Sequence, residues 1–209
     1  MQHSGFIGGY YQVSLWITRL AYLNILWISF TLAGLGVLGI FPATAAMFAV
    51  VRKWTRDEDE IPITATFWKA FKKEFLQANK MGYCLLLIGY ALIQQLQILW
   101  RQEDMMYVLA GFGVLLLVFL YAIVLLYAFP VFAHFQLSVL NYIKWPVIIG
   151  IVHPLLTIVL AVALFFIYTI VYATVPAVLF FFGGSITAYI LTWGAGKTFA
   201  KYESKVAPT

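Results

Sequence analysis

Charged residues are scarce in this chain of 209 residues, at 10%, whereas an ordinary soluble domain carries about 25%. Hydrophobic residues make up 64% of the sequence, more than the core of a soluble domain of this size could bury. Carboxylates are absent from the long apolar stretches, because all eight acidic residues lie between those stretches or in the tail. This absence argues against an ion-coupled transporter, whose spans usually carry ionisable groups. The composition predicts an integral membrane protein.

Motifs for catalysis and cofactor binding are missing as well. The sequence contains no GxxxxGK(S/T) loop for a nucleotide, no HExxH zinc helix and no Cys or His cluster at metal-binding spacing. The single cysteine, Cys84, lies in an apolar stretch and cannot form an internal disulfide. We therefore expect no enzyme, no cofactor and no nucleic-acid partner.

Five apolar stretches are long enough to cross a bilayer, which takes about 20 residues of helix. We expect the chain to fold as one all-α transmembrane domain over residues 1–209, a polytopic helical bundle in contact with lipid. Loops are expected at Arg101–Asp104, Asn141–Lys144 and Tyr168–Tyr172. The expected spans run from about Leu20 to Ile40, Met81 to Trp100, Met106 to Ala128, Trp145 to Phe166 and Ala173 to Trp193.

The segment after the first span leaves two architectures open. Three glycines between residues 34 and 39, followed by Pro42, interrupt the apolar run. In the preferred interpretation one span ends near Ile40 and Pro42–Trp54 lies at the membrane interface, which gives five spans. In the alternative, Trp16–Val51 forms a tight hairpin of two short spans, which gives six.

Residues 52–80 are expected to form a charged loop followed by an amphipathic helix. Phe67, Phe71 and Phe75 recur at i, i+4 spacing, and lysines fall mostly on the opposite face. The helix either lies on an anionic leaflet or is a solvated helix packed on the membrane domain. The candidate contacts to anionic lipid are Lys69, Lys72 and Lys73.

The distribution of cations predicts the orientation. Ten of the thirteen Lys and Arg residues lie between residues 51 and 80 or in the tail from residue 197. The positive-inside rule therefore places loop 52–80 and the C-terminus in the cytoplasm, with an even number of spans between them. The N-terminus is outside if the chain has five spans and inside if it has six.

A few polar side chains within or beside the spans are candidates for contacts with neighbouring helices or with a partner. His153 is expected about eight residues into the fourth span, at a depth of ~12 Å, where a histidine bonded to a neighbouring helix is the favoured interpretation and a ligand or gating role is the alternative. His134 is expected near the inner interface. Asn24, Gln94 and Gln95 lie inside spans and can hydrogen-bond across helices.

The N-terminal half resembles a known family in two stretches. These are RLAYLNILWISFTLAGLGVLGIFPATAAMFAVVRKW and, after an acidic turn, TFWKAFKKEFLQANKMGY. Together they are similar to the N-terminal signature of the YesL-like family of bacterial integral membrane proteins. The matching part covers residues 18–85, and the rest of the chain is similar in hydropathy alone. Members are commonly encoded beside sugar ABC importers in Gram-positive bacteria, which implies a part in oligosaccharide uptake at the cell membrane.

The resemblance implies a non-enzymatic accessory subunit of an ABC-type oligosaccharide importer. Such a subunit would dock on the permease subunits and meet the sugar only through the importer. The alternative is an independent small transporter or channel for a small polar solute, with the glutamines and His153 in its path.

Overall fold

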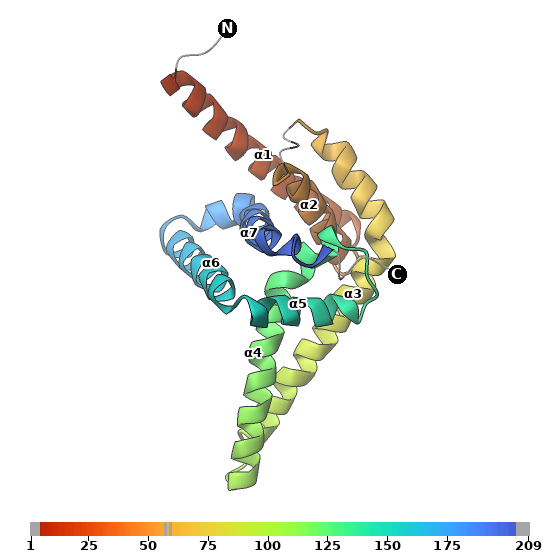
Figure 1. Cartoon of the computed structure of the whole chain (residues 1–209), viewed down its shortest axis with the longest axis vertical. Helices are drawn as coiled ribbons and strands as arrows, with labels where there is room; N and C mark the ends of the chain where they lie inside the picture. Colours follow the sequence, from red (N-terminus) through yellow and green to blue (C-terminus); the bar gives the residue numbers. More distant parts are fainter. Residues whose placement is uncertain (1–4, 57, 59, 204–209) are drawn as a thin grey trace.

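The computed structural model describes residues 5–56, 58 and 60–203, and within these ranges the chain forms seven helices and no strand (Figure 1). Five of them, α1, α3, α4, α6 and α7, are long and apolar enough to cross a membrane. The predicted all-α, multi-pass membrane fold is therefore confirmed. The helices are α1 (Gly5–Ala33), α2 (Ile40–Trp54), α3 (Ile63–Leu99), α4 (Met105–His134), α5 (Asn141–Val152), α6 (Pro154–Thr174) and α7 (Pro176–Phe199).

Helices α1 and α2 form an antiparallel hairpin around a turn at residues 34–39. Near the turn, the indole Nε1 of Trp27 donates a hydrogen bond to Thr44 Oγ1 at 3.0 Å. At the other end, the rings of Trp16 and Trp54 meet edge to face with centroids 5.7 Å apart. The first part of α1 and the last turn of α2 therefore lie at the same end of the hairpin.

Helix α2 is the core of the molecule. Nine of its fifteen residues are buried, and it contacts α1, α3, α4 and α7. Small side chains at Ala43, Ala45 and Ala46 allow the neighbouring backbones to approach closely. The segment Pro42–Trp54, expected at the membrane interface, is covered by protein on most of its faces, and α2 is not among the five helices that are long and apolar enough to cross a membrane.

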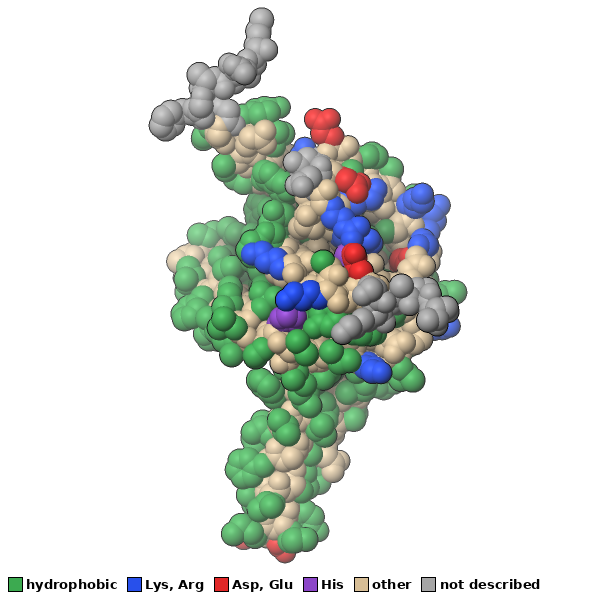
Figure 2. All heavy atoms as spheres, viewed as in Figure 1, with side chains coloured by type: hydrophobic (Ala, Val, Ile, Leu, Met, Phe, Trp, Pro, Cys, Tyr) green, Lys and Arg blue, Asp and Glu red, His purple; other side chains and the backbone are tan. Residues whose placement is uncertain are grey.

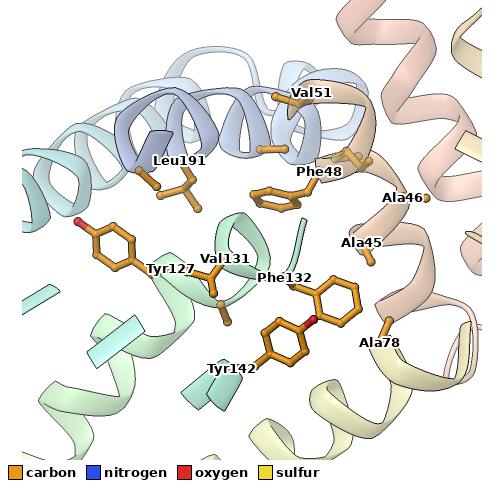
Figure 3. Packing of buried hydrophobic residues seen from close by; sticks show 14 of the residues in the cluster. Ala45, Ala46, Phe48, Val51, Ala78, Tyr127, Val131, Phe132, Tyr142 and Leu191 are labelled. Atoms are coloured by element: carbon orange, nitrogen blue, oxygen red, sulfur yellow. The ribbon is translucent and has the colours of Figure 1, made fainter. Parts of the chain in front are cut away.

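The buried side chains around α2 come from helices far apart in the sequence. Figure 3 shows Ala45 and Phe48 of α2, Val131 and Phe132 of α4, and Leu191 of α7 in one shared core. This core fixes the ends of α4 and α7 against α2, where the polar residues described below are held.

Helix α3 is continuous over 37 residues, so the expected amphipathic helix and second span are a single element. In its first half, the aromatic residues Phe67 and Phe71 face the protein and not the lipid. Phe67 and Phe71 are buried, and their ring centroids lie 5.1 and 5.2 Å from that of Phe30 in α1. This packing agrees with the alternative in which the amphipathic segment packs on the membrane domain.

The second half of α3 and the first half of α4 form a hairpin that projects from the rest of the molecule (Figure 1). The hydroxyl of Tyr121 donates to the carbonyl of Leu85 at 2.8 Å and ties the two helices together. At the tip, the Asp104 carboxylate accepts the Met106 N–H at 2.9 Å and caps α4. Most of the outer surface of this projecting hairpin is apolar and exposed.

The expected fourth span is broken at His153, which joins α5 to α6. Pro154 lacks an N–H and clashes with the carbonyl four residues earlier, so the helix cannot continue through it. The Thr157 hydroxyl compensates by donating to the carbonyl of Gly150 at 3.0 Å. Helix α6 alone is long enough to span, and α5 is a separate short apolar helix.

Two predicted loops are misplaced. Asn141–Lys144 begins α5, and the connection from α4 is residues 135–140 instead. Tyr168–Tyr172 lies inside α6, which continues to Thr174. The chain turns at Val175 because the following Pro176 disfavours a helical conformation at the residue before it and starts α7.

Candidate functional site

The ends of α2, α4 and α7 bring together a polar cluster that we call the charged end. Its residues are Arg52, Arg56, His134, Lys197 and Glu203, and they line a pocket of about 340 Å³. Figure 2 shows Lys and Arg side chains gathered in the upper part of the molecule together with several acidic side chains, and further acidic side chains at the foot of the projecting hairpin. The clustering of cations along the chain is thus also a clustering in space.

Glu203 links the end of the chain to two other elements. Its Oε1 lies 3.0 Å from His134 Nε2 and 3.6 Å from the Arg56 Nη2. The carboxylate is 55% exposed, so water screens both pairs and they stabilise the fold only weakly. Their effect is to hold the segment after α7 beside the ends of α2 and α4.

Arg52 is the least exposed of the arginine and lysine side chains at the charged end. Its Nη1 donates to the carbonyl of Ala133 at 2.6 Å and satisfies an otherwise unpaired group in the last turn of α4. Burial lowers the pKa of the guanidinium, and the positive charge of Arg56 lowers it further. The ordinary pKa of arginine is so far above neutral that Arg52 remains charged at neutral pH.

The two candidate histidines, His134 and His153, both lie at or beside the charged end. His134 ends α4, and its Nε2 lies 3.0 Å from Glu203 Oε1. His153 was expected inside the fourth span, but it lies in the break between α5 and α6. There its Nε2 is 3.3 Å from the Tyr202 hydroxyl. Its ring therefore meets the segment that follows α7.

Asn24 has a structural environment. Only 1% of its surface is exposed, its Nδ2 donates to Phe180 O at 2.6 Å, and its Oδ1 accepts from Ser185 N at 3.1 Å. The amide side chain thus bridges two backbone groups of α7. Both ends of the amide are occupied, which leaves Asn24 little capacity for a ligand.

The three glutamines in the second half of α3 have the opposite environment. Gln94 and Gln95 lie near the tip of the projecting hairpin, and Gln95 and Gln97 are exposed. Among the described residues, none donates a hydrogen bond to these three side chains or accepts one from them. The glutamines and His153 therefore lie in different parts of the fold, and no described contact joins them.

The three lysines proposed to contact lipid divide into two environments. Lys72 places its Nζ 4.6 Å above the Trp68 ring on the outside of α3. Lys69 and Lys73 instead line a second pocket, of about 280 Å³, together with Arg52. The sequence did not predict that Arg52 lines this pocket. Its position near the end of a short apolar helix does not indicate which other helices will pack against it.

Within the described ranges, no three His, Cys, Asp or Glu side chains converge as metal ligands would. Glu203 was not foreseen as a partner of His134, because the two residues are 69 positions apart. The charged end carries three cationic side chains and one carboxylate on a packed helical core.

Comparison with known proteins extends the resemblance found in the N-terminal half. Residues 20–96 match the family model described as "Protein of unknown function, DUF624". The uncharacterized protein YteU of Bacillus subtilis (strain 168) is 38% identical over 192 residues, covering 90% of this chain and 84% of its own length. YesL and YesV of the same organism, also described as uncharacterized, are 35% and 32% identical over 190 and 189 residues.

These alignments cover 91% and 90% of this chain and 89% and 90% of the length of YesL and YesV. The likeness is therefore not confined to residues 18–85 but includes the C-terminal helices. No solved structure matches the chain. With such identity over nearly its whole length, the chain belongs to the YesL-like family of membrane proteins, whose N-terminal part is the DUF624 domain.

Proposed function

We propose that the protein is a non-enzymatic accessory subunit of an ABC-type oligosaccharide importer in the bacterial cell membrane, docked on the permease subunits. The association of the family with sugar importers suggests the partner, and the glutamines of the projecting hairpin support a docking role. The sugar is met only through the importer. The sequence has no nucleotide-binding motif of its own and no carboxylate within a span to couple transport to ions.

The observation that supports docking most directly is the environment of Gln95 and Gln97. Both side chains are exposed on an otherwise apolar hairpin that the rest of the chain leaves uncovered. A polar amide facing hydrocarbon lacks the hydrogen bonds that water would supply. A neighbouring transmembrane helix can supply them, at about 0.6 kcal/mol for each bond.

Docking predicts that the two glutamines hold the importer. Replacing Gln95 and Gln97 by leucine removes two interhelical hydrogen bonds, so recovery of permease subunits from native membrane in mild detergent should fall about eightfold. The measurement is quantitative mass spectrometry of the co-purified importer subunits. Gln102→Leu, in the exposed turn at the tip, is the matched control and should leave recovery unchanged.

The opposite result would favour the other function. If no importer subunit accompanies the wild-type chain, and the isolated chain moves a small polar solute across proteoliposomes, the small-transporter alternative replaces the accessory role. The small-transporter alternative has no support from the described contacts, because none of them joins the glutamines to His153.

We further propose that the charged end faces the cytoplasm and that the N-terminal end of α1 lies on the same side. The positive-inside rule supports the first point. The pairing of Trp16 with Trp54 supports the second, because it sets the early part of α1 beside the end of α2. This arrangement corresponds to the six-segment alternative, in which the short α2 returns the chain to the side from which α1 started.

The topology predicts a pattern of cysteine labelling in intact cells. In a Cys84→Ala background, an impermeant maleimide should label Gln102→Cys at the tip of the projecting hairpin. Tyr11→Cys and Glu58→Cys, both exposed, should react only after the membrane is permeabilised. Labelling of Tyr11→Cys together with Gln102→Cys in intact cells would instead place the N-terminus outside.

A further inference from the structure

A basic pocket lies between α2, the first half of α3 and the end of α4. Its volume is about 280 Å³, and Arg52, Lys53, Lys69 and Lys73 all line it. Glu74 is the one carboxylate among the described lining residues. The pocket therefore has a formal excess of three positive charges.

Neighbouring carboxylates offset only part of this excess. Glu74 lies 3.2 Å from Lys73, and Glu58 lies 3.9 Å from Lys53. Within the described ranges no carboxylate lies within 4 Å of Arg52 or Lys69. Arg52 is partly buried, and a charge removed from water without a counter-charge is costly unless an anion joins it.

The pocket is held open by small side chains. Ala45 and Ala49 of α2 face Ala70 of α3 across it, and Phe132 of α4 forms part of the wall. The hydrogen bond from Arg52 to Ala133 O holds the guanidinium in place and uses one of its five N–H groups. The other N–H groups remain as donors on a pre-positioned fork.

We propose that this pocket binds a phosphate group, carried either by an anionic phospholipid or by a soluble phosphate ester. A phosphate group has several charged oxygens, which can accept hydrogen bonds from the guanidinium of Arg52 and from the flanking lysines at the same time. The pocket therefore suits a phosphate better than it suits a single carboxylate. The apolar floor accepts the carbon part of the same molecule. The proposal is independent of the accessory role, since the projecting hairpin does not line the pocket.

The test uses the full chain in phosphatidylcholine nanodiscs, with two probes that separate the two sources. One is glycerol 3-phosphate in solution, and the other is phosphatidylglycerol added to the nanodisc. Binding is followed by thermal stabilisation and, for the lipid, by its retention in native mass spectrometry. Lys69→Glu is the pocket variant, and Lys80→Glu, exposed on the same helix outside the pocket, is the charge-matched control.

We expect one of the probes to stabilise the wild-type chain and the Lys80→Glu control, and Lys69→Glu to weaken that binding about tenfold. Response to glycerol 3-phosphate identifies a soluble phosphate ester as the ligand, and response to phosphatidylglycerol alone identifies the lipid. Ala49→Leu, which fills the pocket without changing charge, should also reduce binding. The proposal is overturned if neither probe binds, if both lysine variants weaken binding equally, or if Ala49→Leu binds as well as wild type while remaining folded.

Discussion

Phe67→Ala is expected to lower the free energy of unfolding by about 3 kcal/mol, because it leaves a cavity in a fully buried aromatic cluster. Phe67 is 0% exposed, and its ring lies against Phe30 of α1. Losing this contact loosens the first half of α3 from the α1–α2 hairpin. The measurement is the shift in the unfolding transition of the purified chain when a mild detergent is titrated with a denaturing one.

Leu76→Ala is the control for Phe67→Ala. Leu76 lies on the same helix but is 72% exposed, so its truncation should change stability by a few tenths of a kcal/mol at most. If both variants are equally mild, and Phe67→Ala instead weakens association of the segment with anionic liposomes, the aromatic face lies in the lipid interface and not in the protein core.

Asn24→Leu is expected to cost about 2 kcal/mol, because it leaves Phe180 O and Ser185 N of α7 without their side-chain partner. The same unfolding titration measures it. Gln95→Leu is the matched control, since it also replaces a span amide by leucine but removes no described hydrogen bond. It should leave the isolated chain as stable as wild type. Equal losses for the two variants would mean that Asn24 is not a structural bridge.

Hydropathy was sufficient to predict which segments are apolar helices. It could not predict how they pack, as α2 demonstrates. A run rich in alanine that ends in Arg52 and Lys53 fits an interface as well as a core, because its side chains are small and only the end is charged. Four neighbouring helices cover it, and three of them come from later in the chain. That information is not local to the segment.

The predicted helix boundaries were wrong where the distribution of charge and the positions of prolines gave different indications. The lysines up to Lys80 indicated a change of solvent, but no proline interrupts the backbone there, so α3 continues through. The opposite error occurred at Pro154 and Pro176. Both prolines lie in apolar sequence and set the true boundaries, although hydropathy alone placed each of them inside an expected span.

The polar candidates were identified by residue type, and the structure separates them by partner. Asn24 is fully bonded within the chain, and His134 and His153 meet the segment after α7. The candidate glutamines Gln94 and Gln95 have no described hydrogen-bond partner. A single sequence could not distinguish these cases. The difference lies in contacts between residues that are up to 161 positions apart.

Photocrosslinking from Gln95 in living cells tests most directly whether the projecting hairpin docks on an importer. A photoreactive amino acid replaces Gln95 in one strain and Ile158, which is 58% exposed on α6, in another. We expect irradiation at position 95 to give an adduct that mass spectrometry identifies as a permease subunit of a sugar importer, and position 158 to give little or none. Failure of position 95 to form any protein adduct, with the chain present at its normal level in the membrane, would contradict docking through this hairpin.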